Sequence, residues 1–196
     1  MNNFRIFTES KTDVKFLKDY IADVFNKELQ NIDFDMLGSW SGYKIGGTLT
    51  NSIKENSVDN SKLSILILDA DTDFTARLHE IENDFIQYKV SVKIFLFPNH
   101  ANNGNIETLL AEIAVNKELM ECFHSYEKCI EGYEKPVSKS KIFAYLDALL
   151  PQKNKKNNKE DLIQDANRNY KNKEHWDLNH NYLNPLKDFL SQHLNL

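Results

Sequence analysis

The stretch Ile65-Leu66-Ile67-Leu68-Asp69-Ala70-Asp71 joins an unbroken aliphatic run to two aspartates. Four consecutive aliphatic residues are typical of a central strand in a parallel sheet, because both faces of such a strand are buried. In open α/β sheets, ligand sites gather at the carboxyl ends of these strands. Two neighbouring carboxylates repel each other unless a cation or a shared proton relieves the repulsion. The stretch therefore predicts a buried strand that ends at a divalent-metal site.

A second acidic position follows the strand-like segment Phe4-Arg5-Ile6-Phe7 near the N-terminus. Glu9 comes directly after this segment, and an amphipathic helix with apolar residues at helical spacing follows it. Because both strands run into helices in the same direction, we expect Glu9 to share a sheet edge with Asp69 and Asp71. Either Thr12 or Asp13 is expected to cap the helix.

The order of expected elements alternates between strands and helices, which predicts an α/β fold with a mostly parallel, doubly wound sheet. These elements are strand 4–8, helix 13–29, strand 40–45, helix 48–55, strand 64–69, helix 74–88 and strand 91–97. Further helices are expected at 106–116, 118–131, 139–150 and 184–194. We interpret 1–115 as a core and 116–196 as a helical extension packed on it in one compact domain, with a mobile Lys/Asn-rich loop near 151–160.

Length and composition fit a globular protein rather than a membrane protein. The chain has 196 residues, 41% of them hydrophobic, and no apolar stretch approaches the roughly 20 residues that cross a membrane. No secretory signal is recognisable, so a cytoplasmic location is expected. Cys122 and Cys129 are about 10 Å apart on one helix, too far for a disulfide, and we expect them to be buried reduced thiols.

The two acidic segments resemble the Toprim family, the catalytic module of topoisomerases, bacterial primases, small ribonucleases and phage-defence nucleases. That family pairs a glutamate after its first strand with an Asp-x-Asp after a later strand, and the counterparts here are Glu9 with Asp13, and Asp69 with Asp71. The likeness extends from Phe4 to Leu110 and is strongest to small stand-alone bacterial Toprim-like proteins related to overcoming-lysogenization-type nucleases. Segments 138–146 and 176–190 resemble the same group.

The resemblance implies a Rossmann-like fold and a nuclease site that uses Mg²⁺ or Mn²⁺. Asp69 and Asp71 would hold the metal, and Glu9 would act as general acid or base or bind a second ion. Asp73 would add a third carboxylate, although it could instead cap helix 74–88. Asp13 could cap its helix or support the site. Glu107 corresponds to the acidic position after the last core strand, or it could be a favourable first-turn residue.

Two positions depart from the family pattern. Ser10 stands where a glycine is usual, and Asp73-Phe74 replaces the glycine that often follows the second aspartate. Neither change removes an expected metal ligand, but both bear on how closely the backbone can approach a phosphate.

Positive charge is concentrated in one part of an acidic chain. Residues 135–173 contain ten Lys or Arg against four Asp or Glu, so this region has a net charge of +6 and leaves −11 for the rest of the total of −5. We expect Lys139 and Lys141, at the start of a helix, to bind nucleic-acid phosphates together with Lys11, although a lysine-rich segment can also be a solvated surface.

The sequence thus predicts Mg²⁺-dependent hydrolysis of a nucleic-acid phosphodiester, in a phage-defence or DNA-repair system linked to an ATPase. A non-catalytic module is the alternative, in which the acidic edge binds metal or nucleotide and a partner ATPase supplies the activity. A receiver-like phosphorylation domain is disfavoured, because the first strand is not followed by an adjacent acidic pair.

Overall fold

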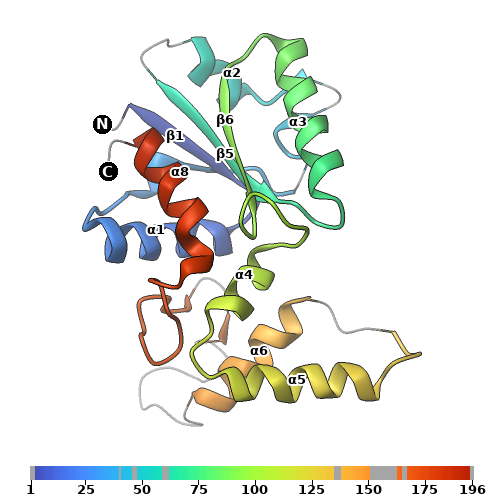
Figure 1. The fold of residues 1–196 in the computed structure, drawn as a ribbon. Coiled ribbons are helices and arrows are strands. Elements are labelled where there is room, and N and C mark those ends of the chain that lie inside the picture. Colours follow the sequence, from blue (N-terminus) through green and yellow to red (C-terminus); the bar gives the residue numbers. More distant parts are fainter. Residues whose placement is uncertain are drawn as a thin grey trace.

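The computed structural model describes residues 3–39, 41–45, 48–58, 62–134, 138–150, 163–164 and 167–194 (Figure 1). Its elements in chain order are β1 Phe4–Thr8, α1 Lys11–Phe25, η1 Asn31–Asp33, β2 Phe34–Met36, β3 Lys44–Ile45, β4 Thr48–Leu49, α2 Asn51–Val58, β5 Leu63–Asp69, α3 Phe74–Tyr88, β6 Val92–Phe97, α4 Ile106–Ile113, α5 Lys117–Cys129, α6 Ser138–Leu149, η3 Asn181–Leu183 and α8 Asn184–Leu194.

The main sheet has four parallel strands in the order β2-β1-β5-β6. In the central pair, Ile6 lies beside Ile65 and Thr8 beside Ile67, so β1 and β5 end at the same edge. The expected α/β class and the three strands predicted at 4–8, 64–69 and 91–97 are therefore confirmed.

The prediction of a sheet strand at 40–45 is wrong. Lys44–Ile45 pairs instead with Thr48–Leu49 in a separate antiparallel hairpin, so the helix expected at 48–55 begins only at Asn51. The fourth strand of the main sheet is β2, whose three residues are too few to show a periodic pattern. Its place beside β1 is supported by the ion pair of Arg5 with Asp35, at 2.8 Å between Nε and Oδ2.

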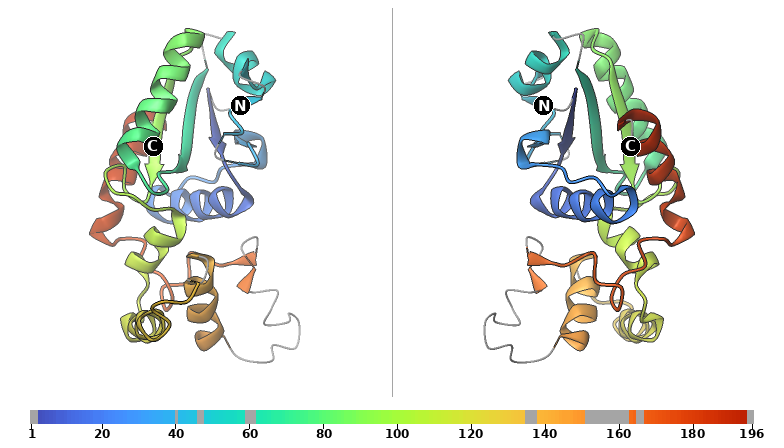
Figure 2. Two further views of the ribbon diagram at one scale, coloured as in Figure 1. Left: turned by 90° about the vertical axis from the view of Figure 1, so that its right-hand side faces the viewer. Right: turned by 90° about the vertical axis from the view of Figure 1, so that its left-hand side faces the viewer.

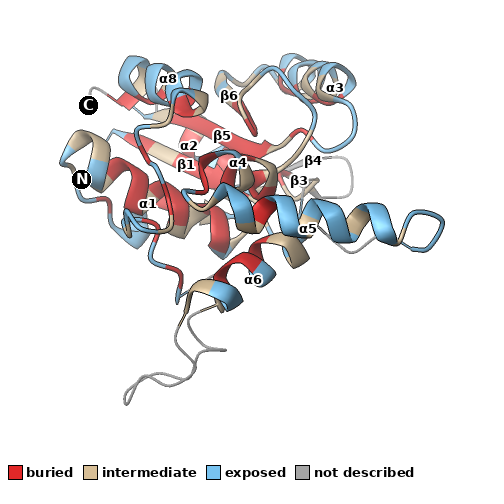
Figure 3. Cartoon of the chain, turned by 60° about the horizontal axis from the view of Figure 1, so that its bottom comes forward, coloured by how far each residue is buried: buried red, intermediate tan, exposed pale blue. Residues whose placement is uncertain are grey.

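Both faces of the sheet are buried, as the aliphatic run predicted. Ile65 and Ile67 of β5 belong to a core shared with α1, α4 and α8, whereas Leu66 and Leu68 belong to a second core shared with α2 and α3. All four side chains are at most 1% exposed. Figure 3 shows the strands and the inner faces of the helices buried, while most of α5 is exposed.

The C-terminal helices pack on the sheet and beyond its carboxyl edge. Phe189 of α8 contacts Phe95 of β6 with 5.3 Å between ring centroids. Helices α5 and α6 lie past the carboxyl ends of the strands in Figure 1 and in both views of Figure 2. One core cluster contains residues from both 1–115 and 116–196, including Trp176, which packs on Tyr145 at 5.2 Å.

Three local predictions are corrected. The N-cap of α1 is Ser10 rather than Thr12 or Asp13, and the helix stops at Phe25 because Asn26 adopts a left-handed conformation with φ of 52°. Cys122 and Cys129 are free but exposed, since Met120 is the one buried residue of α5. The loop expected near 151–160 lies outside the described residues. No helix in the described ranges is long and apolar enough to span a membrane.

Candidate functional site at the carboxyl edge of the sheet

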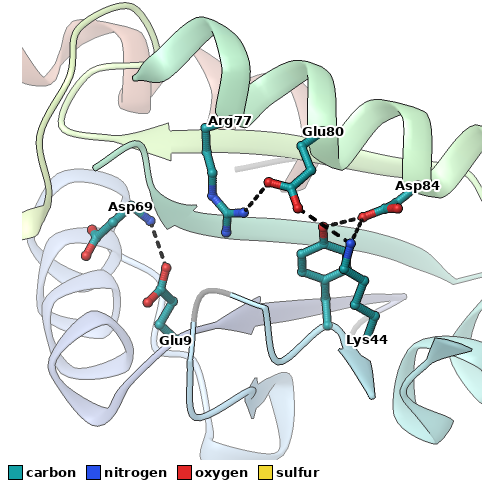
Figure 4. Close-up of polar contacts among 7 residues, drawn as sticks. Glu9, Lys44, Asp69, Arg77, Glu80 and Asp84 are labelled. Atoms are coloured by element: carbon teal, nitrogen blue, oxygen red, sulfur yellow. Dashed lines mark hydrogen bonds and ion pairs between the residues drawn. The ribbon is translucent and has the colours of Figure 1, made fainter. Parts of the chain in front are cut away.

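Glu9 and Asp69 meet at the ends of the two central strands. Glu9 follows β1 and Asp69 is the last residue of β5, and the parallel pairing of these strands brings them to one edge. Glu9 Oε1 accepts a hydrogen bond from the Asp69 backbone N–H at 3.2 Å (Figure 4). Residues 60 positions apart in sequence are thus joined at the place where the sequence predicted an acidic site.

The Asp69 carboxylate, at the end of β5, is half-buried and bonded to the start of α4. Its Oδ1 atom accepts a hydrogen bond from the backbone N–H of Ile106, the first residue of α4, at 3.0 Å. Burial, followed by the negative charges of Asp13, Glu9 and Glu107, raises the pKa of Asp69 to about 9. The hydrogen bond to Ile106 favours the ionised form but does not offset these effects.

Asp13 lies in the first turn of α1 and is buried, with 4% of its surface exposed. Its Oδ2 atom accepts a hydrogen bond from the backbone N–H of Ser10 at 2.8 Å, which anchors the start of the helix. Burial raises the pKa of Asp13 to about 7, and the charges of Glu9 and Glu107 add to the rise. Asp13 therefore both stabilises the start of α1 and adds charge to the site.

Glu107, in the first turn of α4, is 5% exposed and lies close enough to the other three carboxylates to raise the pKa of each. For Glu9 itself, burial is the largest cause of a raised pKa. We call Glu9, Asp13, Asp69 and Glu107 the carboxylate cluster. Its members come from β5, from α1 and α4, and from the turn after β1, so only the tertiary structure assembles it.

Asp71 and Asp73 lie outside the buried cluster, on the exposed turn that follows β5. Asp71 has φ of 55° and exchanges two backbone hydrogen bonds with Gly104, at 2.8 and 2.7 Å. Gly104 is required there, because its φ is 133° and an added Cβ would lie 2.7 Å from the Thr108 hydroxyl. The charge of Asp71 still contributes to the raised pKa of Glu9, so this exposed carboxylate lies near the cluster.

Asp73 caps α3, which was one of its two predicted roles. Its Oδ1 atom accepts a hydrogen bond from the backbone N–H of Ala76 at 3.0 Å. The Asp73 side chain therefore caps the first turn of α3, although the residue is exposed.

Arg77 is a cationic neighbour that the sequence analysis missed. It lies on the inner face of α3 with 7% of its surface exposed, and its charge lowers the pKa of Glu9. Figure 4 shows it pointing from α3 into the space between Glu9 and the Lys44–Asp84 pair. The spacing of Arg77 was the signal in the sequence. It stands one helical turn before the buried Ile81 and two before the buried Phe85, so it lies on the same inner side of α3.

A polar network connects Arg77 to the hairpin of β3 and β4. Arg77 Nη1 lies 3.4 Å from Glu80 Oε2, and Lys44 Nζ lies 3.5 Å from the same carboxylate. Asp84 Oδ2 accepts from Lys44 Nζ at 2.5 Å and from the Tyr43 hydroxyl at 2.6 Å (Figure 4). These contacts hold the hairpin against α3, beside the cluster.

The lysines expected to bind nucleic acid occupy different surroundings. Lys11 is exposed at the first residue of α1, two positions after Glu9, and Lys139 is exposed near the start of α6. Lys141 Nζ lies 3.4 Å from Glu127 Oε2 and 5.8 Å from the centroid of the Phe123 ring. Lys141 also lines a cavity of about 230 Å³ together with Glu107.

The donor atoms at this edge suit a hard divalent cation. In the described ranges, no three His, Cys, Asp or Glu side chains are already arranged around a common metal position. The cluster nevertheless offers only carboxylate oxygens, the ligand type that Mg²⁺ and Mn²⁺ prefer. Burial first, and then mutual repulsion, raises the pKa values of Glu9, Asp13 and Asp69, and a bound cation would favour their ionised forms. The donor chemistry of these residues therefore suits such an ion.

Comparison with known proteins identifies a family. No match was found among curated proteins or among solved structures. A family model described as protein of unknown function (DUF3226) matches residues 3–195, nearly the whole chain. The chain therefore belongs to the DUF3226 family.

Proposed function

We propose that this protein is a Mg²⁺- or Mn²⁺-dependent nuclease that hydrolyses phosphodiester bonds of nucleic acid. The observation that carries the proposal is the carboxylate cluster itself, which gathers four acidic side chains at the carboxyl edge of a parallel sheet and raises the pKa of Asp69 to about 9. Desolvated like charges are costly to the fold, and such an arrangement is typical of functional sites. The resemblance of the same segments to Toprim supports the assignment.

Each acidic residue has a defined task in this proposal. Asp69 and Asp71 would hold the metal ion, which would supply positive charge to offset the negative charge that develops on the phosphoryl oxygen. Glu9 accepts or donates the proton at the reacting oxygen, a role that suits a glutamate whose pKa is raised by burial. Asp13 and Glu107 orient Glu9 and Asp69 and keep the local charge negative.

Arg77 acts as a positioning residue in the same scheme. Its guanidinium favours the ionised form of Glu9 and so opposes the effect of burial. Because Arg77 is almost fully buried, it acts through Glu9 rather than on the substrate directly.

The proposal is tested by incubating the purified protein with plasmid DNA, single-stranded DNA and RNA, in Mg²⁺ or Mn²⁺ and in EDTA. We expect cleavage only with metal. Glu9→Gln and Asp69→Asn should each lower the rate by at least about 100-fold, the usual loss for a proton-transfer or charge-stabilising group. Asp23→Asn is the matched control, because Asp23 is an exposed carboxylate near the other end of α1.

Two results would contradict the proposal. Metal-dependent stabilisation of the wild type without any cleavage would reject autonomous hydrolysis, and it would support the module that binds metal or nucleotide for a partner ATPase. Equal activity in wild type and Asp69→Asn would reject the site itself. A cytoplasmic setting is part of the proposal, because exposed free thiols such as Cys122 and Cys129 persist in reducing compartments.

A further inference from the structure

A groove runs along the outer side of α1, next to the edge strand β2. Its volume is about 400 Å³, and three lysines line it together with three apolar residues, Val14, Phe34 and Met36. The lysines are Lys11, Lys15 and Lys18. Spacings of four and three residues place them in one stripe on the helix surface. We call this feature the lysine groove.

The contacts of these lysines hold two of them over the groove. Lys18 Nζ donates to Asn31 Oδ1 at 2.6 Å and lies 5.9 Å from the centroid of the Phe34 ring. Lys15 forms an ion pair with Asp19, one turn further along α1. No carboxylate is among the residues that line the groove. The groove is therefore positively charged on a chain whose total charge is −5.

The end of the groove at Lys11 and Met36 lies next to the turn that carries Glu9. Lys11, which lines the groove, stands two residues after Glu9 in the chain. The segment after β2 is bonded to the same turn, since the Leu37 N–H donates to the Thr8 carbonyl at 2.8 Å and the Gly38 N–H donates to the Glu9 carbonyl at 3.0 Å. A chain lying along α1 would thus come close to the turn that carries Glu9.

The lining determines what kind of chain fits. Lys11 and Lys18 suit phosphates of a polyanion, whereas Asp19 offsets the charge of Lys15 between them. Met36 is 54% exposed and neighbouring Ile32 is 55% exposed, so apolar surface lies beside the lysines. Bases of a single strand can cover such surface, whereas a duplex keeps its bases stacked inside and presents only its backbone.

We propose that the lysine groove binds single-stranded nucleic acid and delivers it to the carboxylate cluster. This inference rests on the proposed nuclease function, because it names the form of the substrate and its path. Phosphates contact Lys11 and Lys18, and a base covers Met36.

The test measures binding of a short labelled single-stranded oligonucleotide over a range of salt concentrations, in Asp69→Asn protein so that cleavage does not interfere. The groove variant adds Lys11→Gln and Lys18→Gln; Lys15 is left in place because it neutralises the buried Asp19. The matched control adds Lys54→Gln and Lys89→Gln, two exposed lysines on α2 and at the end of α3 with the same charge change.

We expect the groove variant to bind at least about tenfold more weakly at low salt and its salt slope to fall by about 1.4, the value for two lost phosphate contacts on a single strand. The control should change affinity by less than about twofold, since exposed charges far from a binding site are screened. Met36→Ala should weaken binding a few-fold and leave the slope unchanged, because it removes contact area but no charge. A duplex of the same sequence should bind more weakly.

Equal losses in the groove and control variants would overturn the groove as a site, as would an unchanged salt slope in the groove variant. Equal affinity for the duplex would overturn the single-strand assignment. These outcomes are separate from failure of the proposed function, because binding is measured without cleavage. Cleavage with an inert groove would leave the nuclease proposal intact, and groove binding by a protein that never cleaves would reject the nuclease alone.

Discussion

The carboxylate cluster and the lysine groove lie on either side of the same turn, yet their charges differ in physical character. Glu9 and Lys11 are two residues apart, but Glu9 turns inward beside Asp69 whereas Lys11 remains exposed. The acidic groups are desolvated and raise one another's pKa values, so they affect the stability of the fold. On the outer side of α1, Lys11 is exposed and Lys15 and Lys18 are half-buried. The inward-facing carboxylates should therefore bind a cation. The outward-facing lysines attract anions and lower the stability of the fold less.

The surroundings of Lys141 differ from those of the lysine groove. Its ion pair with Glu127 and the presence of Glu107 and Glu112 around the same cavity offset its positive charge. A lysine surrounded by carboxylates attracts a polyanion less than one in a groove lined without them. The comparison therefore ranks Lys11 and Lys18 above Lys141 as phosphate contacts.

The largest expected effect concerns pH and the stability of the metal-free protein. The pKa of Asp69 is about 9 in the fold and about 3.9 in an unfolded chain, so the folded state binds more protons between these values. The contribution of Asp69 to the free energy of unfolding is complete below a pH of about 4 and is lost as the pH rises towards 9. We expect the free energy of unfolding to fall by up to about 1.4 kcal/mol per pH unit for such a group.

Urea unfolding in EDTA at several pH values measures this dependence. Asp69→Asn should flatten the curve between about pH 7 and pH 9, where Asp13 has already lost its proton. The Asp23→Asn control should keep the wild-type curve. If the wild type were as stable at pH 9 as at pH 5, the proposed contrast between the carboxylate cluster and the exposed charges would be contradicted.

The second prediction concerns the metal. Mg²⁺ or Mn²⁺ should raise the melting temperature by mass action, corresponding to about 2.7 kcal/mol at a hundredfold excess over the dissociation constant. The rise should be larger at alkaline than at acidic pH, since the carboxylates must lose protons to bind the ion. Thermal melts of wild type, Asp69→Asn and Asp71→Asn at two pH values test this; a shift of the same size in all three proteins would contradict it.

The third prediction separates the exposed carboxylates from the buried ones. Asp73→Ala should destabilise the protein by about 1 kcal/mol through loss of the α3 cap, and the metal-induced melting shift should persist. Asp73→Asn, which can still cap, should be close to wild type in both respects. Loss of the metal shift in Asp73→Asn would instead make Asp73 a metal ligand, as the Toprim resemblance also allowed.

The smallest effect is expected at the helix α6 lysines. Lys139→Gln with Lys141→Gln should lower the salt slope of single-strand binding by less than about half a unit, compared with about 1.4 for the groove variant. The same titration, run with both double variants, decides between the two surfaces. A larger decrease for the α6 pair would restore the original expectation that these lysines are the main phosphate contacts.

Local patterns were sufficient for most of the secondary structure. The run at 65–68 predicted a doubly buried strand, and the bounds predicted for α3 and α8 agree with the structure. Strand β2 was missed because it has three residues, which is too short for a periodic signal, and its pairing with β1 depends on a partner distant in sequence. The cysteines were misplaced because the helix pattern does not say which side of α5 meets the core.

The sequence by itself determined that acidic residues stand at the ends of the two central strands, because a local hydrophobic pattern marks each strand and the helix after it. Only the tertiary structure decided that Asp13 and Glu107 join Glu9 and Asp69, that Asp71 remains exposed, and that Arg77 approaches from α3. It also placed the lysine groove against β2. Burial and pKa shifts depend on atoms brought together from distant parts of the chain, and no local pattern contains those distances.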